Sequence, residues 1–359
     1  MTDALVSAAT QPQFDSVLVK RWAQDVLCAA GLAPSDARIT ADLLLFSQIR
    51  GVISHGLSLL GPYVERIRDG GTNLVPVPRH KANGGVCVID ADDAIGSVCA
   101  MRASEAAADS ARSNGIGMAV VRNANHIGAL AFYVQGLAAQ GLVAIMATNA
   151  DPSMAPPEGG PPLLGSNPLA VAVPDPRAEG RIVLDMATTA VAHGRLVAAL
   201  RQDQAIPEHW AVDSAGLPTT DPAEALKGAL LPAAGYKGYG LAFMIDLLTA
   251  GLSGGQIGRD IVPLKASTDK PQGISVLVIA IDPEYCSGAE HLSLAVTALE
   301  DHVAAGAAAG KIPPVAPGVP ESQRAMRSGR DVAVDLRLVE ELSRLGKDVA
   351  VPWPFERSL

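Results

Sequence analysis

Short apolar runs alternate with helix-forming segments in the middle of the chain. Valine, isoleucine and other apolar residues fill residues 86–90, 117–121 and 142–148, and Ala-rich helical segments cover residues 97–114 and 129–140. Strand, helix, strand, helix, strand is the pattern of a layered α/β sheet. In such sheets functional groups gather beyond the carboxyl ends of the strands, where His126 and Asn149 would lie.

Apolar residues at helical spacing fill most of the two ends of the chain and also appear at residues 241–252. Helices are expected at residues 16–30, at 34–49, after Pro62, and at 241–252, 291–310 and 332–345. Further strands are expected at residues 169–173, 182–185 and 274–281. We therefore expect an α/β fold in two domains. A helical domain would combine residues 1–75 with 300–359, and an α/β cofactor-binding and catalytic domain would cover residues 76–299.

Composition excludes several classes of function. The net charge of −9 argues against a nucleic-acid partner, because phosphate binding needs a basic face. The four cysteines show no CxxC pair or zinc-type spacing, which is typical of free thiols in a reducing compartment. No signal peptide is visible, and Gly, Pro or charged residues interrupt every apolar stretch before it reaches membrane-spanning length. A soluble cytoplasmic protein without a membrane partner is therefore expected.

Two short motifs place a histidine beside glycine and a small polar residue. They are Arg50-Gly51-Val52-Ile53-Ser54-His55-Gly56, between two expected helices, and Asn125-His126-Ile127-Gly128, after the second expected strand. Histidine can exchange a proton with a carbonyl or hydroxyl near neutral pH, and an adjacent glycine would let a ligand approach the backbone. A single histidine of this kind is more often a packed or capping residue, but two of them suggest a paired acid/base or acid/anchor site.

Three further motifs follow in the chain. They are Leu164-Gly165-Ser166-Asn167-Pro168, Leu184-Asp185-Met186-Ala187-Thr188-Thr189 and Gly235-Tyr236-Lys237-Gly238-Tyr239-Gly240. In this order the motifs resemble the type-2 malate/L-lactate dehydrogenase family, which also includes ureidoglycolate, sulfolactate and diketogulonate oxidoreductases and the reductase of piperideine-2-carboxylate. The resemblance runs from about Phe14 to Pro317. It implies a cofactor site that is not a Rossmann fold, in agreement with the lack of a complete G-x-G-x-x-G motif.

The resemblance implies NAD or NADP as cofactor and a set of residues that contact it. These residues are Asn149, Asp151, Asp185, Met186, Ala187, Thr188, Arg195 (where relatives usually have lysine), Lys237 and Gly238. The residues alone leave alternatives open. Asp185 is placed to cap a following helix. Lys237 is either a solvated lysine or part of an anion site at a helix N-terminus.

Carbonyl reduction by hydride requires a proton at the developing alkoxide. His126 is expected to supply it, because it follows a strand and matches the catalytic histidine of the family. His55 is the second candidate, with Ser54 beside it to bind substrate oxygens. Arg50 and Leu59 complete the expected substrate contacts. No metal is expected, because the other histidines show no ligand spacing.

Leu59 departs from the family pattern. Many relatives carry an arginine at this position, where a guanidinium would hold a substrate carboxylate through two hydrogen bonds. A leucine either forms an apolar pocket wall, leaving Arg50 and His55 to bind the carboxylate, or it faces the core between helices. The first alternative predicts a substrate that is bulkier or less charged near this wall than lactate or malate.

The sequence therefore predicts an NAD(P)-dependent oxidoreductase that transfers a hydride between nicotinamide and a 2-hydroxy acid/2-oxo acid pair or a related cyclic imine. The alternative is a catalytically weakened dinucleotide- or ligand-binding member of the same fold that has lost the carboxylate clamp. Retention of both His55 and His126 favours the enzyme. The resemblance also implies a homodimer whose subunits both help to enclose the site.

Overall fold

The computed structural model describes residues 11–177, 181–306 and 314–355. The chain divides into two compact units, Met1–Arg68 with Pro320–Leu359, and Asp69–Val319. The expected domains placed residues 69–75, 300–306 and 314–319 with the helices, whereas the structure groups these residues with the sheet. We call the two parts the helical unit and the sheet unit.

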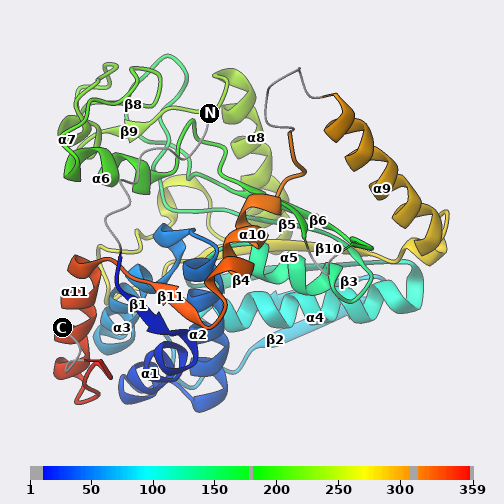
Figure 1. Ribbon diagram of the computed structural model, residues 1–359, viewed down its shortest axis with the longest axis horizontal. Helices are drawn as coiled ribbons and strands as arrows, with labels where there is room; N and C mark the ends of the chain where they lie inside the picture. The colour runs from blue at the N-terminus through cyan, green and yellow to red at the C-terminus, as the bar shows by residue number, and fades with distance from the viewer. Residues whose placement is uncertain (1–10, 178–180, 307–313, 356–359) are drawn as a thin grey trace. The chain divides into compact units, whose positions relative to one another are not determined.

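The sheet unit contains a seven-stranded mixed sheet (Figure 1). In spatial order its strands are β2 (Arg79–Asn83), β3 (Val86–Asp90), β4 (Ile116–Ala124), β10 (Ile274–Ile281), β5 (Val143–Thr148), β6 (Leu169–Val173) and β7 (Ile182–Met186). The six strands expected from the sequence are confirmed, and β2 is additional. Among these strands β3 and β4 form the parallel pair, and all other neighbours are antiparallel.

The central position of β10 decides which ends of the strands meet. Both β4 and β5 run antiparallel to β10, with Ala124 opposite Ile274 and Thr148 opposite Val276. The carboxyl ends of β3, β4, β5 and β7 therefore lie at the same edge of the sheet, where β6 and β10 begin. We call this edge the strand-end edge.

Helices with small buried residues cover the sheet. Helix α4 (Gly96–Asn114) packs on β3, β4 and β10, and α5 (Ala131–Ala138) packs on β5, β6 and β7. Ala100, Ala103, Ala107 and Ala111 of α4 recur at helical spacing and are 0% exposed, so this helix lies close to the strands. Helix α8 (Tyr236–Asp246) continues into a π-helical turn, η3 (Leu247–Gly251), which contacts β4 and β10.

The other elements of the sheet unit are shorter. They are α6 (His193–Arg201), β8 (Ala211–Val212), α7 (Pro222–Ala225), β9 (Ala229–Leu230), η4 (Gly258–Asp260), η5 (Pro283–Tyr285) and α9 (Ala289–Ala305). The sequence did not predict α6, α7 or the β8–β9 pair. Residues 307–310, at the end of the helix expected in place of α9, lie outside the described residues.

The helical unit joins the two ends of the chain. Its elements are β1 (Gln13–Asp15), α1 (Ser16–Ala29), α2 (Pro34–Ile49), η1 (Ile53–His55), η2 (Leu57–Leu59), α3 (Leu60–Asp69), α10 (Val319–Ser328), β11 (Asp331–Ala333) and α11 (Leu336–Asp348). Strands β1 and β11 pair antiparallel (Figure 1). Trp353 packs edge-on against Trp22, with ring centroids 4.6 Å apart. Among the described helices, none is both long enough and apolar enough to cross a membrane.

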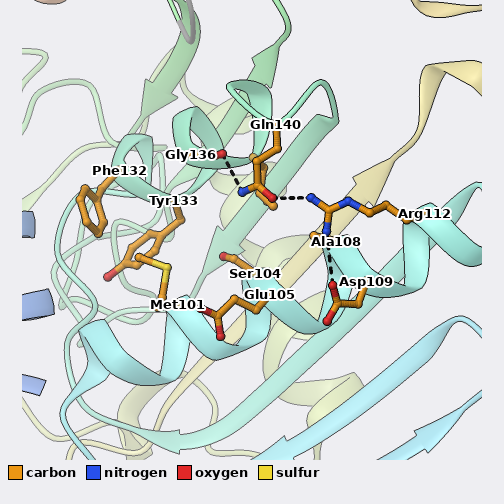
Figure 2. Close-up of a pocket in the computed structure, with 11 residues that line it drawn as sticks. Met101, Ser104, Glu105, Ala108, Asp109, Arg112, Phe132, Tyr133, Gly136 and Gln140 are labelled. Carbon is orange, nitrogen blue, oxygen red and sulfur yellow. Dashed lines mark hydrogen bonds and ion pairs between the residues drawn. The ribbon is translucent and has the colours of Figure 1, made fainter. Parts of the chain in front are cut away.

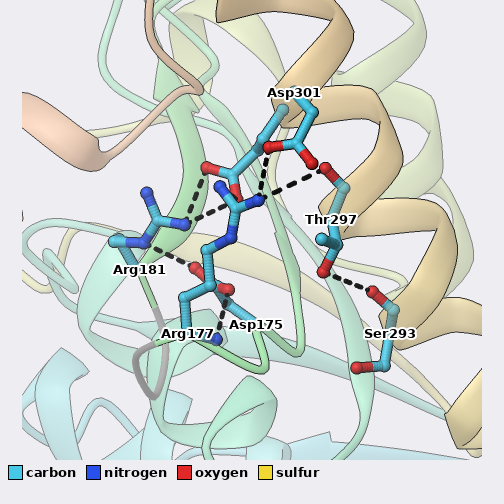
Figure 3. Close-up of polar contacts among 7 residues, drawn as sticks. Asp175, Arg177, Arg181, Ser293, Thr297 and Asp301 are labelled. Carbon is cyan, nitrogen blue, oxygen red and sulfur yellow. Dashed lines mark hydrogen bonds and ion pairs between the residues drawn. The ribbon is translucent and has the colours of Figure 1, made fainter.

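An ionic cluster connects the segment between β6 and β7 to α9 (Figure 3). Arg181 Nε lies 2.6 Å from Asp175 Oδ2, and Arg181 Nη2 lies 2.7 Å from Glu300 Oε1. Arg177 pairs with Glu300 at 3.1 Å and with Asp301 at 2.8 Å. The Asp175 side chain is 0% exposed and that of Arg181 is 15% exposed, so this pair is the buried part of the cluster.

We expect Arg181→Met to lower the free energy of unfolding by about 3–5 kcal/mol, because it leaves the buried Asp175 carboxylate without its cation. The control is Arg177→Met, whose side chain is 40% exposed, and which should cost about 1 kcal/mol or less. Urea unfolding of the two variants measures both values. Equal losses of unfolding free energy in the two variants would contradict the conclusion that Arg181 stabilises the fold more than Arg177 does.

Candidate functional site

His126 lies two residues after the end of β4, at the strand-end edge, and is half-buried. Its backbone N–H donates to Gln272 Oε1 at 2.9 Å, and Gly128 N–H donates to its Nδ1 at 3.3 Å. Because Nδ1 accepts a hydrogen bond, the neutral ring carries its proton on Nε2.

Two residues that the sequence reasoning missed hold the His126 loop. Gln272 is 0% exposed, and its N–H donates to Asn125 Oδ1 at 3.3 Å. Gly96 begins α4, and a Cβ there would collide with the carbonyl oxygens of Asn125 and His126. No local spacing indicates either contact, since residue 272 is 146 positions from His126 in the chain.

Asn149 follows β5, and its side chain makes hydrogen bonds to other groups inside the protein. Asn149 Nδ2 donates to Asp246 Oδ1 at 3.1 Å and to the Gln256 carbonyl at 2.9 Å. Asn149 Oδ1 accepts the Ser275 N–H at 2.8 Å. The residue is 1% exposed, so its side chain positions the loop that leads to Asp151. Any contact between Asn149 and a dinucleotide would come from its backbone.

Thr188 and Asn167 are also built into the strand-end edge. Thr188 Oγ1 donates to the Ser166 carbonyl at 2.7 Å, and Thr188 is 0% exposed. Asn167 Nδ2 donates to the Ala242 carbonyl at 2.9 Å, and its Oδ1 accepts the Ala150 N–H at 2.9 Å. These side chains join the loop before β6 to α8 and to the loop after β5.

Asp185 lies near the end of β7, and its side chain caps α5, a helix that is 54 positions away in the sequence. Its Oδ2 accepts the Ala131 N–H at the start of α5, at 2.8 Å. The expected cap on the following helix is wrong, because α6 begins after Ala192 without a side-chain cap. Asp185 is an exposed residue, yet desolvation of its carboxyl group by the surrounding atoms raises its pKa to about 6 against the effect of the Ala131 and Leu130 N–H groups.

Lys237 is exposed at the start of α8. The N–H groups of Lys237 and Gly238 donate to the carbonyls of Ala234 and Ala233, at 3.5 and 2.9 Å. The expected anion site therefore depends on the Lys237 ammonium group rather than on these amides. A Cβ at Gly238 would collide with the Ala233 backbone and the Thr188 carbonyl, so this glycine serves close packing.

The remaining predicted cofactor residues are accessible. Met186 is 36% exposed, Arg195 is exposed on α6, and Asp151 and Ala187 are half-buried. Asp151, Met186 and Ala187 lie at the strand-end edge, together with His126 and Asp185. These side chains and the internally bonded Asn149 and Thr188 thus belong to one region of the sheet unit.

The predicted substrate residues lie in the helical unit. Ser54 Oγ is 3.0 Å from His55 Nδ1, and burial lowers the pKa of His55. The guanidinium group of Arg50 stacks on the Phe46 ring at 3.6 Å. Burial lowers the pKa of Arg50 to about 10, and no carboxylate of the described residues pairs with it.

Two expectations for this segment change with the structure. Leu59 is 5% exposed, which places it in the core between helices rather than at an open pocket wall. A Cβ at Gly56 would collide with Gln48 Oε1, so Gly56 is required for packing and not for the approach of a ligand. Gln48 Oε1 also accepts the Leu57 N–H at 3.2 Å.

A cavity of about 280 Å³ lies between α4 and α5 (Figure 2). Arg112 closes one side of it by binding Gln140 and Asp109. None of the predicted site residues lines this cavity. Within the described ranges, no group of three His, Cys, Asp or Glu side chains is arranged to hold a metal ion.

Comparison with known proteins relates this arrangement to one family. A sequence profile described as malate/L-lactate dehydrogenase matches residues 15–343. L-sulfolactate dehydrogenase of Methanocaldococcus jannaschii is 34% identical over 333 residues, which cover 92% of this chain and 96% of that protein. The solved structure of sulfolactate dehydrogenase from the same organism has a TM-score of 0.87 at 33% identity, covering 95% of this chain and 98% of that chain.

The names of two further relatives specify a cofactor. Ureidoglycolate dehydrogenase (NAD(+)) of Escherichia coli K12 is 38% identical over 277 residues, covering 75% of this chain and 78% of that protein. (2R)-3-sulfolactate dehydrogenase (NADP(+)) of Chromohalobacter salexigens is 35% identical over 259 residues, covering 72% of this chain and 78% of that protein. The expected α/β fold is confirmed by these similarities and by the sheet itself.

We expect Asp185→Asn to change how stability depends on pH. The pKa of Asp185 is raised in the folded chain, so its contribution is complete below pH 3.8 and is lost as the pH rises through about 6. Asparagine still offers an oxygen to Ala131 but cannot ionise. The variant should therefore gain stability relative to the wild type between pH 5 and pH 8, measured by urea unfolding.

The matched control is Asp269→Asn, at an exposed position of the sheet unit. In this control the free energy of unfolding should change between pH 5 and pH 8 by as much as it does in the wild type. An Asp185→Asn variant with the wild-type pH profile would contradict the raised pKa.

Proposed function

Because the chain belongs to the malate/L-lactate dehydrogenase family, we propose that it transfers a hydride between a nicotinamide dinucleotide and a 2-hydroxy acid/2-oxo acid pair or a related cyclic imine. It is an oxidoreductase that acts on a hydroxy acid. Its relatives are named for NAD(+) and for NADP(+), so the proposal covers both dinucleotides. The observation that carries the proposal is the position of His126 at the strand-end edge, where its Nδ1 accepts the Gly128 N–H.

The accessible cations of the sheet unit fit the phosphates of a dinucleotide. Lys237 and Arg195 are both exposed, and a Cβ at Gly235 or Gly240 beside Lys237 would meet no atom within 4 Å. Cations and open backbone of this kind suit a diphosphate. When bound, the nicotinamide accepts the hydride from the hydroxy acid or returns it to the carbonyl.

His126 acts on the oxygen of the substrate in this proposal. In the direction of reduction its Nε2–H donates to the carbonyl oxygen and supplies the proton that the alkoxide needs. The bond from Gly128 to Nδ1 holds the ring, and the bond from the His126 backbone N–H to Gln272 holds the loop that carries it. Gln272 thus serves as a positioning residue.

Arg50 is the proposed anchor for the substrate carboxylate. Its guanidinium group rests on an aromatic face instead of a carboxylate, which leaves N–H donors for an anion. Leu59 cannot take this part, because it has no donor and is buried. Ser54 and His55, four and five positions after Arg50, are proposed to bind the other substrate oxygens.

A titration of NADH and NADPH fluorescence, followed by turnover with a panel of 2-oxo acids and cyclic imines, tests the proposed function. We expect binding of at least one dinucleotide and turnover with at least one member of the panel. Binding without turnover on a broad panel would favour the alternative, a catalytically weakened ligand-binding protein of this fold.

We expect His126→Ala to lower the turnover of carbonyl reduction by about two to four orders of magnitude, because the proton donor is lost. Dinucleotide affinity and thermal unfolding should stay near wild type. The control is His209→Ala, at an exposed histidine of the sheet unit, which should leave turnover unchanged. Near-normal turnover in His126→Ala would end the assignment.

We expect Lys237→Ala to weaken dinucleotide binding by roughly 1–3 kcal/mol, the scale of one charge-assisted contact. Lys81→Ala serves as the control, because Lys81 is an exposed lysine on β2, the edge strand opposite β7. Fluorescence titration at low salt measures both affinities. Unchanged binding in Lys237→Ala would identify Lys237 as a solvated lysine without a ligand.

A further inference from the structure

The cavity between α4 and α5 contains none of the residues of the proposed site, and it has the form of a small ligand pocket (Figure 2). Its volume of about 280 Å³ lies near the lower end of the range of about 300–1,000 Å³ that is typical of small-molecule sites. Met101, Phe132, Tyr133 and Leu137 give it an apolar wall. We call it the α4–α5 cavity.

Gly136 keeps one side of the α4–α5 cavity open. It lies inside α5, where a glycine is less favourable than an alanine. A Cβ at this position would meet no atom within 4 Å, so the packing of the chain does not require the glycine. Ala108 is a second small residue in the cavity lining, on α4. The space between the two helices is therefore left free by small residues on both of them.

Two hydroxyl groups of the cavity wall are engaged inside the protein. Ser104 Oγ donates to the Ala100 carbonyl at 2.8 Å, and Tyr133 Oη donates to the Ile127 carbonyl at 2.6 Å. Each hydroxyl has one proton to donate, and a carbonyl already accepts it. A ligand with an acceptor group therefore gains no donor from either side chain. What Tyr133 offers is its ring, which lies edge-on to the Phe132 ring with centroids 5.2 Å apart.

The charged side chains around the cavity leave one negative charge uncompensated. Arg112 pairs with Asp109 at 3.3 Å and also binds Gln140, so the charges of Arg112 and Asp109 offset each other. Glu105 lies one turn before Asp109 on α4 and is exposed. In the described part of the chain, no lysine, arginine or histidine pairs with Glu105. The cavity thus combines an apolar wall with a single free carboxylate.

We propose that the α4–α5 cavity binds a small organic cation, an ammonium group on an apolar body about the size of one ring. The ammonium group would donate to the Glu105 carboxylate, and the apolar body would pack against Phe132 and Leu137. Aromatic faces attract a cation that lies within about 6 Å of the ring centroid, which adds to the preference for positive charge. Glu105 would repel an anion, and the net charge of −9 also favours the approach of a cation.

Ligand-observed NMR titration of the full chain tests the proposal near neutral pH, where an alkyl amine carries its proton. The probe is benzylammonium, and benzyl alcohol and benzoate serve as its neutral and anionic analogues. We expect benzylammonium to bind with a Kd of roughly 1 mM, as is typical of so small a ligand. The two analogues should bind at least about fivefold more weakly, because neither of them pairs with a carboxylate.

Two variants locate the binding site. Glu105→Gln keeps the shape of the side chain but removes its charge, so it should weaken benzylammonium binding about fivefold and leave the affinity for benzyl alcohol unchanged. Gly136→Leu places a side chain in the open space and should abolish the binding of all three compounds. The control is Glu290→Gln, at an exposed glutamate of α9, and it should bind benzylammonium as the wild type does. Circular dichroism establishes that each variant is folded.

Three outcomes would overturn the proposal. They are a wild type that does not bind benzylammonium, benzoate binding as tight as that of benzylammonium, and benzylammonium binding that withstands both substitutions in the cavity. If Gly136→Leu does not fold, the comparison of Glu105→Gln with Glu290→Gln decides alone, because both change only an exposed carboxylate. All titrations are made without dinucleotide or hydroxy acid, so their outcome is independent of the proposed function.

Discussion

The carboxylate of Asp246 is the buried group on which the strand-end edge depends. It accepts hydrogen bonds from the Asn149 side chain and the Gly258 backbone, and none of the described lysines or arginines pairs with it. Burial raises its pKa, while these neutral donors favour the ionised form. A buried polar group of this kind is tolerated only when its hydrogen bonds are complete, so it locks α8, the loop after β5 and the segment before η4 in one arrangement.

The same constraint relates the candidate site to the surface of the molecule. Asp246, Thr249 and Ser253 turn the polar side of α8 and η3 inward, and the large apolar side chains are left outside. At its beginning the same helix carries Lys237, the residue proposed to meet the dinucleotide. One helix thus presents a cation at its first turn and a row of large exposed apolar side chains along its length. The inward polar contacts account for both properties.

The secondary structure was largely predictable because it depends on local patterns. Apolar runs of strand length predicted β3 to β7 and β10, and helical spacing predicted α1, α2 and α4. The patterns could not show that β10 inserts between β4 and β5, since an apolar run indicates a buried strand but not its neighbours. They also missed β2, whose residues are exposed throughout and, apart from Ala82, polar.

The sequence by itself determined which residues could carry chemistry: histidines, lysines and carboxylates in loops that follow strands, in motifs typical of one dehydrogenase family. The tertiary structure decided what each of them touches. Asn149 bonds inward, Asp185 caps a helix that precedes it in the chain, and Gln272 binds the backbone of His126 from 146 positions away. Such contacts follow from the packing of distant segments, and local propensity and spacing carry no information about them.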